Sequence, residues 1–146
     1  MKSRTRARCA ALQALYEIDI AGHIPEIVIH ERIVEQSLDD RMAVFTNQIV
    51  LGVWPIIKDL DQFISEQAPE WPLDQVAVID RNILRIALWE FAVSEITPMK
   101  VAINEAVELA KMYGSDSAPR FVNGVLGSLA SRHNEIKQAL KHLKNE

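Results

Sequence analysis

Hydrophobic residues recur every three to four positions along most of this chain, which is the spacing of one buried face of an α-helix. No segment alternates apolar and polar residues for long enough to indicate a strand. The pattern predicts an all-α protein of six or seven helices. The expected helices cover residues 3–20, about 25–37, about 40–66, about 76–93 and 98–113, with a last helix that opens at 115–117 and runs past Leu129.

Glycine, proline and aspartate mark the expected ends of the first helices. Gly22 ends the first helix, and Pro25 opens the second, because proline suits the first helical position. Asp39 or Asp40 caps the third. Pro55 lies inside that long helix and removes one intrahelical hydrogen bond, so we expect a kink or break at residues 52–55.

Similar signals mark the later helices. Thr97 is expected to be the N-cap of a helix in which Pro98 holds the first position, and Gly114 ends that helix. The charged end of the last helix is expected to fray beyond His133. A loop around Trp71 divides the chain into an N-terminal half of about 1–68 and a C-terminal half of about 73–146, within one domain.

The charge is distributed unevenly. The net charge is −4, but Lys2, Arg4, Arg6 and Arg8 precede the first acid, Glu17, which leaves twelve basic and twenty acidic residues after position 8. Cations at a helix N-terminus oppose the helix dipole unless an anion binds there. An acidic body with a basic tip therefore indicates local capture of an anion.

The sequence offers little for catalysis, metals or membranes. It contains neither a P-loop nor a GxGxxG pattern, and its four histidines lack the spacing of a zinc site, so we expect no cofactor and no metal. Glu105 and Glu108 share a helix face, but that spacing is commonplace on solvated surfaces, and no catalytic residue is assigned. The apolar runs fall short of the roughly 20 residues that span a bilayer, and Cys9 has no disulfide partner, so a cytoplasmic protein without membrane contact is expected.

Two later features carry polar groups in informative places. Arg85 is surrounded by apolar residues, so we expect it to pair with an acid such as Glu90 or Glu105. Ser117, Arg120 and Phe121 lie at the start of the last helix, where free backbone donors and a cation can hold a phosphate and the ring can stack on a base. The alternative is a capped helix with Phe121 in the core.

Three blocks of sequence resemble the NusB family of antitermination factors. They are RTRARCAALQALY at residues 4–16, IDRNILRIALWE at 79–90, and VAINEAVELAKMYG at 101–114 followed by RFVNGVL at 120–126. Their order and spacing cover nearly the whole chain, and the third block is the most specific.

The resemblance implies a fold and a function. It implies two perpendicular three-helix bundles in one NusB-like domain. It also implies that the protein, together with the ribosomal protein NusE, holds the single-stranded boxA element of nascent RNA and so keeps RNA polymerase from terminating in ribosomal RNA operons. Carried over by position, the RNA-binding residues are Arg4, Arg6, Arg8, Gln13, Tyr16, Ser117, Arg120 and Phe121. One cation is missing from the first block where many relatives have adjacent arginines, so greater dependence on NusE is expected.

Two other functions stay open at this point. One is a NusB-like module of the kind associated with ribosomal-RNA methyltransferases, which we rank lower because no cofactor-binding domain follows by Glu146. The other is a purely protein-binding helical adaptor whose arginines contact no RNA. The resemblance is also compatible with a homodimer, since some relatives hide the RNA surface in one.

Overall fold

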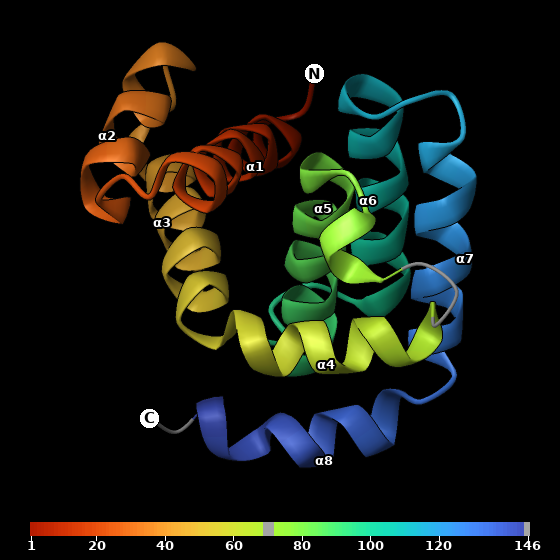
Figure 1. Ribbon diagram of the computed structural model, residues 1–146. Helices are drawn as coiled ribbons and strands as arrows, with labels where there is room; N and C mark the ends of the chain where they lie inside the picture. The colour runs from red at the N-terminus through yellow and green to blue at the C-terminus, as the bar shows by residue number, and fades with distance from the viewer. Residues whose placement is uncertain (69–71, 145–146) are drawn as a thin grey trace. The chain divides into compact units, whose positions relative to one another are not determined.

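The computed structural model describes residues 1–68 and 72–144, and all regular elements within these ranges are helical (Figure 1). This confirms the all-α class. Three short elements interrupt the α-helices, namely the 3₁₀ turns η1 (Trp54–Ile56) and η2 (Leu73–Gln75) and the π-helical segment η3 (Trp89–Val93). The α-helices are α1 (Ser3–Ala21), α2 (Pro25–Glu35), α3 (Asp40–Val53), α4 (Ile57–Gln67), α5 (Val78–Leu88), α6 (Met99–Tyr113), α7 (Ala118–Ala130) and α8 (His133–Lys144).

The chain forms two compact units, Met1–Pro55 and Ile56–Glu146. The boundary falls at the break that Pro55 was expected to cause, because η1 replaces regular helix at this point. The sequence placed the division later, at the loop around Trp71, and residues 69–71 of that loop lie outside the described part of the chain.

The first unit consists of α1, α2 and α3, with α1 packed against both of the others. The ends of these helices follow the local signals. Gly22, after α1, adopts φ +69° and donates its N–H to the Ile18 carbonyl. Pro25 begins α2, and Asp39 caps α3 through its Oδ1, which accepts from Met42 N at 2.9 Å. The core of this unit is built from apolar side chains of all three helices, among them Leu12, Leu15, Ile18, Val28, Ile29, Ile49, Val50 and Val53. Cys9 is buried among them, as expected for a packing residue.

The second unit is centred on α5, α6 and α7, which pack on one another. Helix α4 lies against α5 and α7, and α8 lies against η3. Arg85 links α5 to α4. Its Nε and Nη2 each donate to an oxygen of Asp61 on α4 at 2.7 Å. Its Nη1 donates to Asn82 Oδ1 at 3.1 Å. The expected burial of Arg85 is confirmed, and the acid found here, Asp61, was not among those predicted.

The expected N-cap of α6 is wrong. Pro98 takes the N-cap position, and no side chain caps the helix. Thr97 is instead buried, and its hydroxyl donates to Glu90 Oε1 at 2.6 Å. The Thr97 hydroxyl was expected to cap α6. It is instead engaged by the buried side chain of Glu90 in the preceding helical segment, η3.

The expected fraying beyond His133 is also wrong. Helix α7 ends at Ala130, and α8 begins after a two-residue turn. Ile136 and Leu140 are four positions apart on one face of α8, and both are buried. His133 Nε2 lies 3.0 Å from the Phe91 carbonyl oxygen in η3, and Lys137 Nζ pairs with Glu95 at 2.7 Å. These contacts hold α8 against the unit.

Within residues 1–68 and 72–144, no helix is both long and apolar enough to cross a membrane. In the same residues, no three His, Cys, Asp or Glu side chains lie close enough together to hold a metal ion.

Candidate nucleic-acid interface

The first two turns of α1 place two arginines on one aromatic ring. The guanidinium carbon of Arg4 lies 4.6 Å from the centroid of the Phe45 ring, and that of Arg8 lies 5.1 Å from the same centroid. Both distances are in the range of favourable cation–π contact. Arg4 is exposed to solvent, whereas Arg8 is only 2% exposed.

The burial of Arg8 corrects an expectation from the sequence, which treated Arg4, Arg6 and Arg8 alike as phosphate ligands. A side chain with almost no exposed surface is not available to a phosphate. The physical reason is the ring of Phe45, which α3 brings over the first turn of α1. Arg8 therefore contributes a buried cation–π contact to the packing of Phe45.

Arg6 and Gln13 both bind the residue that ends α2. The Arg6 guanidinium donates to the carbonyl oxygen of Gln36, the C-cap of that helix, where a cation is favoured by the helix dipole. The Gln36 side-chain amide donates to Gln13 Oε1 at 3.3 Å. Arg6 is half-buried, and its bond to Gln36 leaves further N–H donors of the five that a guanidinium carries.

Tyr16 lies farther along α1 and is 40% exposed. The N-terminus of this helix has no side-chain cap and no acid in its first turn. Backbone N–H groups without a side-chain cap and the exposed Arg4 are therefore present together at the helix start.

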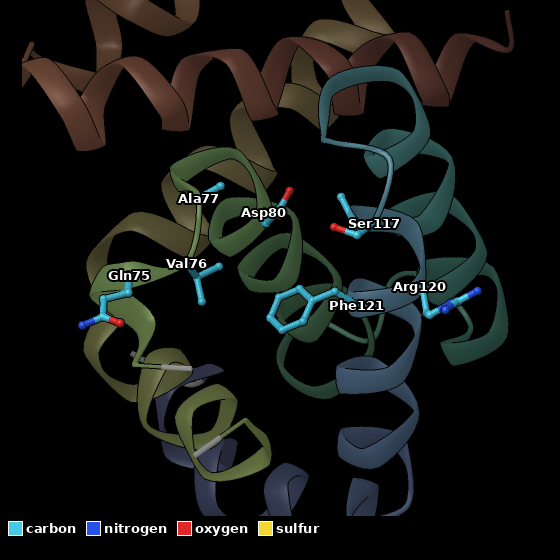
Figure 2. A pocket seen from close by; sticks show the side chains of 8 residues that line it. Gln75, Val76, Ala77, Asp80, Ser117, Arg120 and Phe121 are labelled. Carbon is cyan, nitrogen blue, oxygen red and sulfur yellow. The ribbon is translucent and has the colours of Figure 1, made fainter. Parts of the chain in front are cut away.

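The second unit contains a hollow of about 370 Å³ at the N-terminus of α7, which we call the α7 hollow (Figure 2). Val76 and Phe121 lie on facing sides of it, and Arg120 is exposed at its rim with its guanidinium directed outward. Phe121 is half-buried, between the two alternatives that the sequence left open. The lining residues are Gln75, Val76, Ala77, Asp80, Ser117, Ala118, Arg120 and Phe121.

Ser117 is the N-cap residue of α7 but makes no side-chain capping bond. Its hydroxyl oxygen lies instead 3.3 Å from that of Ser115. Ala118 N donates to the Ser115 carbonyl and Pro119 has no N–H, so within the described residues the Arg120 N–H is the backbone donor of the first turn that is left to bind an anion.

Asp80 is a site residue that sequence reasoning did not single out. It is only 8% exposed, and its Oδ1 has no hydrogen-bond partner within the described part of the chain. Burial without a compensating donor disfavours the carboxylate, which raises the pKa of Asp80 above its usual value. The sequence signal that could have found it is an acid, next to Ile79, in a helix whose apolar residues recur at the spacing of a buried face.

Gly114 allows the turn between α6 and α7 to come close to Asp80. A Cβ at this position would lie 3.0 Å from Asp80 Oδ1 and 2.5 Å from Ala118 Cβ. Any side chain there would therefore push apart the turn, the start of α7 and the carboxyl. The absence of a side chain at Gly114 thus helps to set the shape of the α7 hollow.

The predicted residues therefore form two groups. Ser117, Arg120 and Phe121 surround one hollow in the second unit. The other five belong to α1 in the first unit, where Arg4 and Tyr16 are exposed, Arg6 and Gln13 are bound to Gln36, and Arg8 is buried.

The comparisons with known proteins agree over nearly the full length of the chain. The model of the NusB family matches residues 5–131. The transcription antitermination protein NusB of Roseiflexus sp. (strain RS-1) is 48% identical over 137 residues, which are 92% of this chain and 96% of the relative. The protein of the same name from Bacillus subtilis (strain 168) is 46% identical over 132 residues, 90% of this chain and 96% of the relative.

Solved structures show the same relationship. NusB of T. maritima superimposes with a TM-score of 0.83 at 30% identity, covering 92% of this chain and 96% of that one. A structure of the antitermination factors NusB and NusE in complex with dsRNA gives a TM-score of 0.80 at 25% identity, covering 95% and 98%. With its helical fold, its family match and relatives this similar over almost their whole length, the chain belongs to the NusB family.

Proposed function

We propose that this protein is a transcription antitermination factor that binds single-stranded boxA-type RNA of ribosomal RNA operons together with NusE, as part of an RNA polymerase antitermination complex. Relatives with close to half of their residues identical are transcription antitermination proteins, and a structural relative has been solved with NusE and dsRNA. The observation that carries the proposal is the α7 hollow, where an aromatic ring, an exposed arginine and an uncapped helix N-terminus lie together.

Each part of the α7 hollow suits one part of a nucleotide. The half-buried ring of Phe121 offers a face on which a base can stack, an interaction that tolerates any base. The Arg120 N–H at the positive end of the α7 dipole and the guanidinium of the same residue attract a phosphate. Single-stranded RNA has splayed bases that can enter such a hollow, whereas paired bases in a duplex are stacked within the helix.

In the first unit, we propose that Arg4 and Arg6 contact phosphates and that Gln13 and Tyr16 extend the surface along α1. Arg4 is exposed, and Arg6 retains donors beyond the one bound to Gln36. Arg8 is buried against Phe45 and is not among the residues that contact RNA.

We also propose that the protein acts by binding alone, in the cytoplasm, without catalytic residues or a cofactor. The residues around the α7 hollow are suited to holding an anion and a base, and the relatives of this chain are transcription antitermination proteins. Residues 9–146 contain eight more acidic than basic residues, and this net negative charge repels RNA. RNA binding by the isolated protein should therefore be weak, and NusE should strengthen it.

Titration of a labelled boxA-type oligoribonucleotide tests this function. At physiological salt, fluorescence anisotropy should show weak binding to the protein alone and markedly tighter binding with equimolar NusE, because NusE adds RNA contacts and covers acidic surface. A scrambled strand of the same length is the control and should bind less tightly to the pair. If NusE binds the boxA strand equally well with and without this protein, the proposed function is wrong.

A further inference from the structure

We propose that Phe45 is a positioning residue for RNA binding, which holds the guanidinium of Arg4 in the place where it contacts a phosphate of the RNA backbone. This role rests on the proposed function, in which Arg4 is one of the phosphate contacts. All the contacts that support it lie within the first unit, where α3 brings Phe45 against the start of α1.

The ring of Phe45 is a fixed support. Only 4% of the residue is exposed, so neighbouring side chains enclose it. The next residue, Thr46, is fully buried, and its hydroxyl oxygen lies 3.1 Å from the carbonyl oxygens of both Met42 and Ala7, the second of which belongs to α1. Arg8 also packs on the ring, 5.1 Å from its centroid. Close packing of this kind leaves the ring little freedom to turn.

Arg4 combines contact with this ring and an exposed guanidinium. Its Cζ lies 4.6 Å from the ring centroid, yet the residue is exposed to solvent. Within residues 1–68 and 72–144, Arg4 forms no ion pair, so no acid there competes with RNA for its charge. A guanidinium over a ring contacts it with its face, which leaves the N–H donors at its edge available for bidentate binding to a phosphate.

A support of this kind raises affinity without adding a contact to RNA. A long side chain that is free in solution loses conformational entropy when it binds a phosphate. The cation–π contact with Phe45 restricts Arg4 before RNA arrives, so less entropy remains to be lost on binding. The negative face of the ring also offsets the repulsion between the guanidinium groups of Arg4 and Arg8.

Arg132 in the second unit shows how a similar ring contact differs when acids are present. Its Cζ lies 5.7 Å from the centroid of the Phe63 ring. Its guanidinium also donates to Glu66 at 2.8 Å and to Glu135 at 2.6 Å, and these carboxylates engage the donors that a phosphate would need. The ring contact of Arg4 leaves such donors open.

A double-mutant cycle on the full chain tests the role of Phe45, with a boxA-type oligoribonucleotide and NusE at a fixed concentration in every arm. Phe45→Leu alone should weaken RNA binding about threefold, through the entropy that Arg4 must then lose. Arg4→Ala alone should weaken it about fivefold, the share of one phosphate contact near physiological salt. Because Phe45 acts through Arg4, the double variant should also be about fivefold weaker, whereas independent effects would multiply to about fifteenfold.

Two further variants separate the ring from the volume that it fills. Phe45→Met fills a similar volume without a ring face, so it should weaken binding as Phe45→Leu does. Phe45→Tyr keeps the ring face and should recover most of the affinity that the other two variants lose. Thermal melts identify the folded variants, and the cycle is completed with Phe45→Met where Phe45→Leu does not fold.

Arg6 provides the matched control on the same helix. It is also a proposed phosphate contact, but it is bound to the carbonyl oxygen of Gln36 instead of lying on the ring of Phe45. Arg6→Ala and Phe45→Leu should therefore act independently, so that their combined effect is the product of the single effects. A general loosening of the first unit would couple Phe45 to both arginines alike.

The outcomes separate the role of Phe45 from the function on which it rests. Independent effects of Phe45→Leu and Arg4→Ala, or equal coupling of Phe45 to Arg4 and Arg6, overturn the role while leaving RNA binding intact. The contact itself is measured without RNA, because the ring should shift the Arg4 δ protons upfield in the wild type but not in Phe45→Leu; unshifted protons in the wild type also overturn the role. If these protons are shifted but the wild type binds no boxA-type RNA with or without NusE, the proposed function fails and the role fails with it.

Discussion

Replacing Asp61 by alanine is expected to lower the free energy of unfolding by about 3 kcal/mol, the lower end of the range for broken buried ion pairs. The Arg85 side chain is 5% exposed and would lose two hydrogen bonds of 2.7 Å. The guanidinium stays charged at any ordinary pH, so burial without its acid is costly. The effect stays at the lower end because Asn82 still accepts one bond and Asp61 itself is 25% exposed. Urea denaturation followed by circular dichroism measures the change.

An exposed ion pair in the same unit provides the control. Glu66 lies 2.8 Å from Arg132 Nη1, but its side chain is 42% exposed, and Arg132 also pairs with Glu135 at 2.6 Å. Glu66→Ala should therefore cost less than about 1 kcal/mol. Equal losses in Asp61→Ala and Glu66→Ala would contradict the claim that burial gives the Arg85 pair its importance.

Replacing Phe121 by alanine is expected to weaken RNA binding by about 1–3 kcal/mol, through loss of the ring on which a base stacks. Because Phe121 is half-buried, its removal should destabilise the fold by less than the roughly 3–5 kcal/mol that a fully buried phenylalanine costs. The measurement requires two quantities on one variant, the affinity for boxA-type RNA with NusE and the midpoint of urea denaturation.

Phe63 offers a matched control for this substitution. It is also half-buried in the second unit, contacts the Arg132 guanidinium at 5.7 Å, and does not line the α7 hollow. Phe63→Ala should reduce stability while leaving RNA affinity unchanged. If the two variants lose RNA affinity equally, Phe121 acts through the stability of the unit and the stacking role is wrong.

The helix ends that the sequence predicted well are those with local causes. Gly22 ends α1 because its backbone adopts a conformation that suits glycine, and Asp39 caps α3 through a residue three positions away. Thr97 was misassigned because its partner, Glu90, is buried beside it by tertiary packing. The same reason explains why Asp61 was not foreseen as the partner of Arg85, since the two lie 24 positions apart.

The candidate site shows the same division between local and tertiary causes. Ser117, Arg120 and Phe121 were found from the sequence because a helix start, a cation and a ring occur within five residues. The burial of Arg8 depends on Phe45 from another helix. The unpartnered oxygen of Asp80 depends on how closely Gly114 approaches α5. Neither of these two contacts can be predicted from the spacing of residues within one helix.

We propose that this protein holds RNA phosphates with arginines at the starts of two helices, and the salt dependence of RNA binding measures these contacts. If Arg4, Arg6 and Arg120 each neutralise one phosphate, the logarithm of the RNA association constant should fall with the logarithm of salt concentration with a slope of about −2, from roughly 0.7 per contact. Arg4→Ala and Arg120→Ala should each flatten this slope by about 0.7. Arg41 is exposed on α3 outside both groups, so Arg41→Ala should leave the slope unchanged. Slopes that are identical in the wild type, Arg4→Ala and Arg120→Ala would show that neither arginine contacts a phosphate.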